Sequence, residues 1–402
     1  MSRATRQDPL RFFVLMLTAL LILGSCDLVG ISENLSDSED EQTYSSSTPA
    51  IAMISLGFRT SMLLKDDGIL YASGSNGSGE MGDFDLPERF DFGVIRIGVK
   101  AAFCGPSAGA FFLHEDGSLY ASGNNWDGQL GAGSGLAAES QLITLDDGVK
   151  VKQIALSGTA TIALDESGQV WVTGENLEKS VWAADGTAPE GDRFTKLSEP
   201  GYLEGVKAIA KSSEHSLYIL QDGSVWACGK NTDGKLGTGP GKIGDVAAQK
   251  MLYVENAMAI AAGNNHSLIL DADGTLYACG SNADGQLGTG DTSITEYSAP
   301  YRVMTRVKAI AAGEKTSYAL TQDGELFVSG DNTYGQTGTG TSSDVFGFTS
   351  IMSDVESIAA GTRYAMFLKT DKTLWAVGNN YFGQLGDCTN TNNRSKPVRV
   401  YY

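Results

Sequence analysis

Two short motifs in this chain have compositions that could bind a phosphate or a metal ion. Gly285-Gln-Leu-Gly288-Thr-Gly290 has the composition of a loop that cradles phosphate, and Asp271-Ala-Asp273-Gly274 begins like a calcium-binding loop. The glycine-rich segment recurs along the chain, and no helical pattern follows it. The acidic segment lacks the later calcium ligands. Both motifs are therefore interpreted as turns.

The chain has only three histidines, His114, His215 and His266. His215 and His266 hold the same position in two repeats, where we expect a structural hydrogen bond. No spacing suggests a Ser-His-Asp set or a Cys-His metal cluster. The sequence therefore assigns no catalytic residue, no metal ligand and no cofactor.

One sequence frame organises the chain: an aromatic residue is followed after three residues by glycine and, two residues later, by asparagine. The frame occurs seven times, at intervals of 48 to 55 residues. The seven sets are Tyr71-Gly74-Asn76, Tyr120-Gly123-Asn125, Trp171-Gly174-Asn176, Trp226-Gly229-Asn231, Tyr277-Gly280-Asn282, Phe327-Gly330-Asn332 and Trp375-Gly378-Asn380. A period near fifty residues indicates a repeat architecture.

The fifth repeat shows the elements that must carry this frame. Apolar runs at 254–262, 266–270 and 275–279 are separated by turn signals, and a fourth run at 300–303 follows the glycine-rich loop. Asp273-Gly274 is a hairpin cue, interpreted as a type I′ turn. Four antiparallel strands in each of seven repeats predict an all-β, seven-bladed β-propeller.

Closure of the ring is expected to involve the C-terminus. The first repeat begins at Ile51 with no fourth-strand segment before it, and the segment 396–401 matches residues 300–303. We therefore predict that residues 396–401 pair beside residues 51–56 and close the propeller.

These residues resemble the repeats of the regulator of chromosome condensation family. The similar segments are Ala262-Gly263-Asn-Asn-His266-Ser267, Asp273-Gly274 and Gly280-Ser-Asn282-Ala-Asp-Gly285-Gln286-Leu287-Gly288. The resemblance covers residues 51–402 and implies a seven-bladed propeller. Repeat 3 departs most from the pattern, so its loop at 177–201 is left without a predicted conformation.

The first 25 residues are typical of a secretory signal: basic residues, a 12-residue apolar run from Phe12 to Leu23, then Gly24-Ser25-Cys26. A transmembrane helix needs about 20 apolar residues, so the run is too short to span a bilayer. Leu23 to Cys26 resembles the lipobox of bacterial lipoproteins, which implies lipidation of Cys26; ordinary secretion is the alternative. Residues 26–49 are acidic and serine-rich and predict a disordered tether, and residues 50–402 form the propeller domain.

The net charge of −19 argues against nucleic acid as a partner. Cys228 and Cys279 share one repeat position and are expected to be buried core residues. Cys104 and Cys388 have no obvious partner, and no disulfide framework is indicated. We expect a monomer.

A binding face is expected where the turn after strand one and the loop after strand three emerge together. These segments vary within the fixed frame, and variable loops on a rigid scaffold are where binding usually lies. Basic residues in repeats 1, 6 and 7 should cluster there with aromatic residues, although a solvated rim would give the same pattern. The candidates are Phe58, Arg59, Trp126, Lys315, Tyr334, Arg363, Tyr364, Tyr381 and Phe382.

The expected function is an exported, lipid-anchored scaffold that binds a protein or a glycan at the bacterial cell envelope, on the inner or the outer membrane. One alternative is an enzyme acting on envelope polysaccharide, which would need clustered carboxylates at the channel mouth. Guanine-nucleotide exchange, the activity that the resemblance implies, is disfavoured by the export signal.

Overall fold

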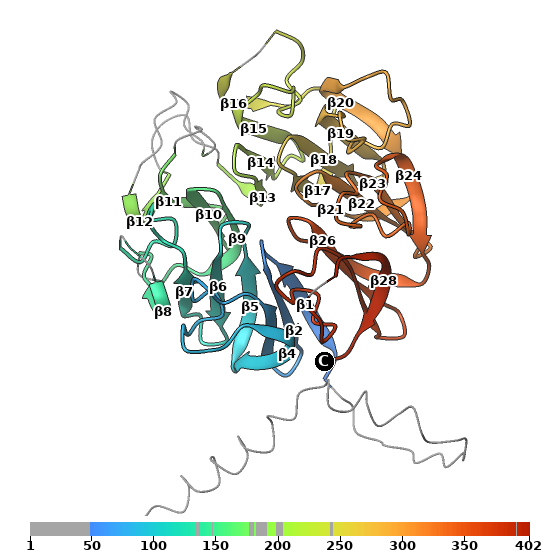
Figure 1. Ribbon diagram of the computed structural model, residues 1–402. Helices are drawn as coiled ribbons and strands as arrows, with labels where there is room; N and C mark the ends of the chain where they lie inside the picture. The colour runs from blue at the N-terminus through green and yellow to red at the C-terminus, as the bar shows by residue number, and fades with distance from the viewer. Residues whose placement is uncertain are drawn as a thin grey trace, which may run out of the picture.

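The computed structural model describes residues 49–402, except 134, 136, 147, 177–180, 182–190, 198–203, 242–243 and 391. Seven four-stranded antiparallel sheets are arranged as the blades of a propeller around a central axis (Figure 1). The predicted all-β, seven-bladed β-propeller is thus confirmed.

The strands of the first four blades follow one another along the chain. Blade 1 contains β1 (Ile51–Leu56), β2 (Thr60–Lys65), β3 (Leu70–Gly74) and β4 (Arg89–Arg96), and blade 2 contains β5 (Val99–Cys104), β6 (Gly109–His114), β7 (Leu119–Gly123) and β8 (Ala137–Ile143). Blade 3 contains β9 (Val151–Ser157), β10 (Ala160–Asp165), β11 (Val170–Gly174) and β12 (Gly191–Lys196), and blade 4 contains β13 (Val206–Lys211), β14 (His215–Leu220), β15 (Val225–Lys230) and β16 (Asp245–Lys250).

The last three blades repeat this order. Blade 5 contains β17 (Ala257–Ala262), β18 (His266–Asp271), β19 (Leu276–Ser281) and β20 (Glu296–Met304). Blade 6 contains β21 (Val307–Ala312), β22 (Thr316–Thr321), β23 (Leu326–Gly330) and β24 (Val345–Met352), and blade 7 contains β25 (Val355–Ala360), β26 (Tyr364–Lys369), β27 (Leu374–Gly378) and β28 (Arg394–Val400). The first strand of each blade lies nearest the axis, and the fourth forms the outer edge (Figure 1).

The predicted pairing of residues 396–401 beside residues 51–56 is wrong. β28 pairs with β27, with Leu374 opposite Val400, whereas β1 pairs with β2 in a separate sheet. Each glycine-rich loop folds back far enough for the segment after it to pair with the third strand of its own blade. Seven complete sheets result, and blade 7 meets blade 1 through side chains and loops.

The turn between strands two and three differs from the type I′ turn expected for Asp-Gly. In blade 1, Gly68 has a φ of 77°, its N–H donates to the Lys65 carbonyl at 3.0 Å, and Asp67 is not among the described residues with positive φ. This is the three-residue hairpin in which a left-handed residue follows a type I turn. Lys372 takes the left-handed position in blade 7, with a φ of 67°.

The hydrophobic core consists of clusters that each span two neighbouring blades. The aromatic residue of the frame belongs to this layer; Trp171 of blade 3, for example, packs with Phe111 and Leu130 of blade 2. Cys228 and Cys279 are buried, as expected.

Several sequence predictions fall outside the described part of the chain. The signal segment 1–25, Cys26, nearly all of the tether 26–49 and most of the 177–201 loop lie there. In the part that is described, no helix has the length and hydropathy of a membrane span.

Candidate binding face

The frame asparagine fixes the loop that follows the third strand in every blade. Its side-chain Oδ1 accepts a hydrogen bond from the backbone N–H five residues later, at 2.8 Å for Asn76 and Met81 and at 2.9 Å even in the divergent third repeat, for Asn176 and Val181. The remaining five pairs are Asn125–Leu130, Asn231–Leu236, Asn282–Leu287, Asn332–Thr337 and Asn380–Leu385. The asparagines therefore hold the loops of the candidate face in one shape.

A buried relay of hydrogen bonds joins these loops to the next blade. The Ser267 hydroxyl donates to the Lys235 carbonyl at 2.7 Å and so accepts from Nε2 of His215, at 2.8 Å. Blade 6 repeats the arrangement, with Ser317 lying 2.9 Å from His266 Nε2. Both histidines are buried, and burial lowers the pKa of His266 to about 4. The two histidines are therefore structural, neutral donors.

Tyr364 holds the same position in blade 7 and closes the ring. Its hydroxyl donates to the Thr60 carbonyl of blade 1 at 2.9 Å and lies 3.1 Å from the Ser61 hydroxyl. Only 1% of the residue is exposed. The prediction that Tyr364 belongs to a binding surface is therefore wrong, because its side chain points into the interface between blades.

Repeat 4 has Ser212 at the position in the turn after strand one where most other repeats have glycine. A contact with His215 explains this departure. The Ser212 hydroxyl lies 2.7 Å from His215 Nδ1, which accepts because Nε2 is the donor. In blade 5 the corresponding residue is Gly263, and no described residue forms a hydrogen bond with the buried Nδ1 of His266.

The basic residues of the turns after strand one do form an arc with aromatic residues. In blade 7, Arg363 donates to Glu314 at 2.8 Å and to the Tyr334 hydroxyl at 2.9 Å, and it lies 4.9 Å from the Tyr334 ring centroid. The hydrogen bond to Glu314 raises the pKa of Arg363. In blade 6, Lys315 pairs with Asp284 at 3.1 Å.

Arg59 of blade 1 completes the arc at the junction between the last blade and the first. Its guanidinium carbon lies 4.0 Å from the ring centroid of Phe382, in the loop of blade 7, and 4.5 Å from that of Phe58. The structure therefore brings Phe58, Arg59, Lys315, Tyr334, Arg363 and Phe382 into one row across three blades; these residues are the cation–aromatic arc.

The two exposed aromatic candidates lie at different distances from this arc. Tyr381 is 55% exposed and directly precedes Phe382 in the loop, so it borders the arc. Trp126 is 72% exposed but belongs to the loop of blade 2, whose Gly128 packs against Asp192 of blade 3. The structure therefore does not bring Trp126 to the arc.

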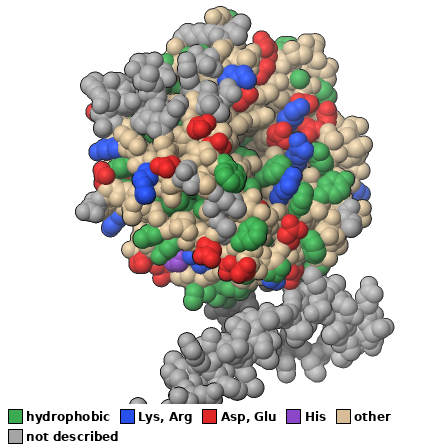
Figure 2. Space-filling view, turned by 60° about the vertical axis from the view of Figure 1, so that its left-hand side comes forward, with side chains coloured by type: hydrophobic (Ala, Val, Ile, Leu, Met, Phe, Trp, Pro, Cys, Tyr) green, Lys and Arg blue, Asp and Glu red, His purple; other side chains and the backbone are tan. Residues whose placement is uncertain are grey.

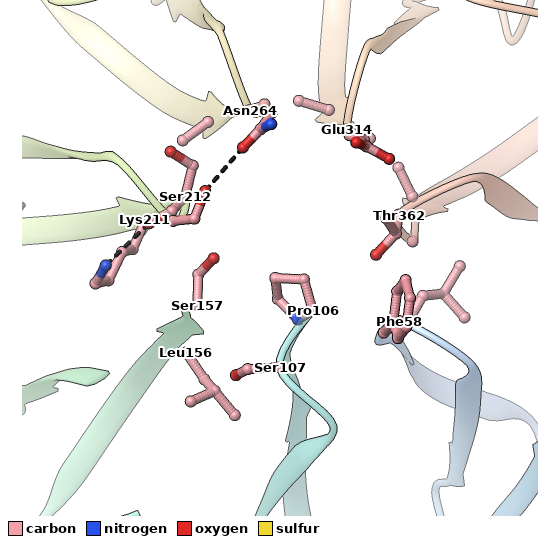
Figure 3. A pocket seen from close by; sticks show the side chains of 18 of the residues that line it. Phe58, Pro106, Ser107, Leu156, Ser157, Lys211, Ser212, Asn264, Glu314 and Thr362 are labelled. Carbon is pink, nitrogen blue, oxygen red and sulfur yellow. Dashed lines mark hydrogen bonds between the residues drawn. The ribbon is translucent and has the colours of Figure 1, made fainter. Parts of the chain in front are cut away.

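The arc borders a cavity at the mouth of the central channel. The ends of the first strands and their turns line a space of 440 Å³, and Figure 3 shows Phe58, Pro106, Ser157, Asn264, Glu314 and Thr362 around it. The lining combines apolar side chains with hydroxyl, amide and charged groups. Such a mixed, concave surface is typical of a ligand-binding or partner-binding site.

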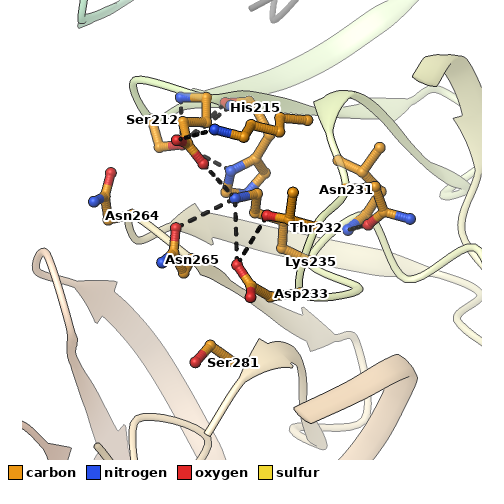
Figure 4. A network of polar contacts seen from close by, with 12 residues as sticks. Ser212, His215, Asn231, Thr232, Asp233, Lys235, Asn264, Asn265 and Ser281 are labelled. Carbon is orange, nitrogen blue, oxygen red and sulfur yellow. Dashed lines mark hydrogen bonds and ion pairs between the residues drawn. The ribbon is translucent and has the colours of Figure 1, made fainter. Parts of the chain in front are cut away.

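A charged network in blade 4, across the ring from the arc, is structural. Lys235 is fully buried; its Nζ lies 2.6 Å from Glu214 and donates to Asn265 at 3.2 Å (Figure 4). Burial alone would raise the pKa of Glu214, but hydrogen bonds from Lys235 and Lys230 outweigh burial and lower it. Lys235 occupies the position that glutamine holds in repeats 2, 5, 6 and 7.

Sequence reasoning missed the acidic partners of the arc. Glu314 and Asp284 neutralise Arg363 and Lys315, and comparison of the turns between repeats could have suggested Glu314, which directly precedes Lys315. On the side of the molecule in Figure 2, basic side chains are likewise interspersed with acidic ones. No broad basic field is visible on this side.

The fold and the candidate site define a β-propeller whose loops are held in a fixed shape on one face. The RCC1-like domain family model matches residues 134–401, so the chain belongs to that family. The human regulator of chromosome condensation is 33% identical over 144 residues, which cover 34% of this chain and 32% of the relative. The chain aligns with less than a third of the length of that relative, and with 14% and 19% of two others.

Solved structures of yeast RCC1 (Prp20) have the same fold. The structure bound to Kap60 has a TM-score of 0.73 and 18% identity, with coverage of 92% of this chain and 91% of that one. A second Prp20p structure, from Saccharomyces cerevisiae, has a TM-score of 0.72 and 20% identity, with 88% of each chain covered; it was described with the binding of Prp20p to Gsp1p and histones. At this identity the likeness establishes the fold alone.

Proposed function

We propose that this protein is a binding scaffold that recognises a partner protein through the cation–aromatic arc and the adjoining channel mouth. The observation that carries the proposal is the arc itself: Arg59 on Phe382 and Arg363 on Tyr334, held in a row across blades 1, 6 and 7. Arginine and aromatic residues are enriched at protein interfaces, and ordered side chains lose little entropy on binding.

Two further observations support a protein partner. The channel mouth beside the arc could receive a protruding side chain, since Phe58 borders both. The yeast propeller with the same fold has been crystallised with a protein, Kap60. A glycan partner would use the same aromatic surface and is one outcome of the experiment below.

The setting of this scaffold is part of the proposal. The sequence before residue 50 supports export and lipidation of Cys26, with residues 26–49 as a tether at the bacterial cell envelope, on the inner or the outer membrane. A monomeric propeller on a tether would leave the loop face accessible to a partner.

The test is affinity capture from envelope extract with the immobilised mature chain. The loop-face variant is Arg59→Ser/Lys315→Ser/Arg363→Ser. The matched control is Lys100→Ser/Lys207→Ser/Lys308→Ser, which removes the same charge at exposed positions near the start of the first strands, on the opposite face. We expect a protein that binds the wild type and the control but not the loop-face variant. Equal capture by all three would contradict the proposal, and capture of a glycan alone would contradict the protein partner.

A further inference from the structure

The three cations of the arc occupy equivalent positions, but they differ in what surrounds them. Arg363 is paired with Glu314, which directly follows the first glycine of the turn in the preceding blade. Lys315 is paired with Asp284, which lies two residues after the frame asparagine of the preceding blade. Thr362 and Phe382 occupy those two positions around Arg59. Neither can supply a carboxylate, so Arg59 lacks the partners that its two counterparts have.

The geometry at Arg59 agrees with this comparison. The guanidinium lies against the rings of Phe382 and Phe58, and in the described part of the chain it has no ion pair and no hydrogen bond. The Thr362 hydroxyl is buried and has no hydrogen-bond partner either, so it does not accept from Arg59. Arg59 is partly exposed. Its donors are thus held in place and remain unused.

We propose that Arg59 is a carboxylate-binding site that takes one acidic side chain of a partner protein; this inference rests on the proposed function. A guanidinium offers a planar fork of donors that matches a carboxylate, and stacking on aromatic rings pre-orders it. The net charge of −19 repels polyanions at long range. A single carboxylate in a largely apolar setting therefore fits better than a highly charged ligand.

The surroundings of Arg59 favour a peptide carboxylate over the carboxylate of an acidic sugar. Tyr381 is 55% exposed and lies next to Phe382 in sequence, and Phe58 leads from Arg59 into the channel mouth. This surface offers apolar area on both sides of the charge. A protein segment, with apolar residues flanking an acidic one, would cover it, whereas a sugar acid would leave most of it exposed.

The test follows the side-chain Nε–Hε signals of Arg59 and Arg363 by NMR in the mature chain, with Arg59→Lys assigning the first. Acetate is titrated at constant ionic strength, and acetamide is its neutral counterpart. We expect acetate to shift the Arg59 signal saturably and acetamide to leave it unchanged. Arg363, already paired with Glu314, should not respond to either. An Arg59 signal that ignores acetate, or responds equally to acetamide, would overturn the proposal.

Two variants exchange the environments of the arginines. Thr362→Glu places a carboxylate beside Arg59 as Glu314 does beside Arg363, and it should weaken acetate binding roughly tenfold, a loss corresponding to about one charge-assisted hydrogen bond. Glu314→Thr should make Arg363 responsive. Unchanged acetate binding in Thr362→Glu would overturn the assignment.

N-acetylglutamate amide and D-glucuronate then separate the two sources of a carboxylate. Tighter binding of the amino-acid derivative supports a protein ligand, and equal or tighter binding of glucuronate overturns it. None of these titrations needs the partner, so they succeed or fail independently of the capture experiment.

Discussion

The guanidinium of Arg59 lies 4.0 Å from the ring centroid of Phe382, which joins the first blade of the propeller to the last. Two hydrogen bonds lie in the same junction. The Tyr364 hydroxyl donates to the Thr60 carbonyl at 2.9 Å, and the Cys388 N–H donates to the Phe90 carbonyl at 2.8 Å. Ring closure and the candidate binding face therefore share one interface. Interactions that stabilise this junction therefore also hold Arg59 against Phe382 in the arc.

Tyr364→Phe tests the junction directly. Removing the hydroxyl leaves the buried Thr60 carbonyl without this donor, which should lower the free energy of unfolding by about 1 to 2 kcal/mol. Urea unfolding measures the change, and Tyr381→Phe is the control, because the Tyr381 side chain is exposed. Equal stability of the two variants would show that the Tyr364 hydrogen bonds do not contribute to closure.

The buried pair of Lys235 and Glu214 should behave as a unit. Glu214→Gln leaves a fully buried ammonium without its closest carboxylate and should cost about 3 kcal/mol. Lys235→Gln in the same chain should recover most of that loss, because Gln129, Gln286, Gln336 and Gln384 fill the equivalent position. A double-mutant cycle of unfolding free energies gives the coupling. Purely additive effects would contradict the network.

Stability should fall as the pH drops from about 6.5 to about 4. Burial lowers the pKa of His266 to about 4 and that of His215 well below its usual value. An unfolded chain binds protons on histidine below about pH 6.5, whereas the folded chain does not until lower pH, so acid favours unfolding. For His266 the loss is on the order of 3 kcal/mol.

His266→Thr is the matched variant for this pH dependence, because Thr60 and Thr316 hold the same position in blades 1 and 6. Its unfolding free energy should depend less steeply on pH between about 4.5 and 6.5 than that of the wild type. An identical slope would mean that His266 is not the titrating group.

The repeated frame predicted the fold because its physical causes are local. Asn76 and its six counterparts bond within their own loops, and Gly74 adopts a left-handed φ of 105° where a side chain would collide with the Arg59 carbonyl. The partner of residues 396–401 was predicted wrongly. A segment that forms the fourth strand of a blade has the same sequence pattern whether it pairs with the third strand of its own blade or with the first strand of the next blade.

The site was predictable only in part. The face and the three blades of the arc followed from turn and loop positions, but Tyr364 was placed on the surface although it aligns with the structural His215 and His266. That alignment was the available signal. Arg363 is paired with Glu314 because its side chain reaches the turn of the neighbouring blade. The direction of a side chain cannot be read from sequence spacing, so neither this ion pair nor the lack of one at Arg59 among the described residues was predicted.

Cys26→Ser tests the proposed membrane anchor. The wild type should sediment with membranes and enter the detergent phase on Triton X-114 partitioning, and the variant should become soluble. Mass spectrometry of the mature N-terminal peptide should show a diacylglyceryl group on Cys26. A Cys26 thiol that is unmodified, or in a disulfide, would contradict the anchor.

The central claim is that the protein binds its partner through the cation–aromatic arc. The direct measurement is the dissociation constant for the captured partner at physiological salt, for the wild type, the Arg59/Lys315/Arg363 triple-serine variant and the Lys100/Lys207/Lys308 control. The account predicts affinity at least about tenfold weaker for the arc variant alone, as expected when interface arginines are removed. Equal affinities of the wild type and the arc variant would contradict it.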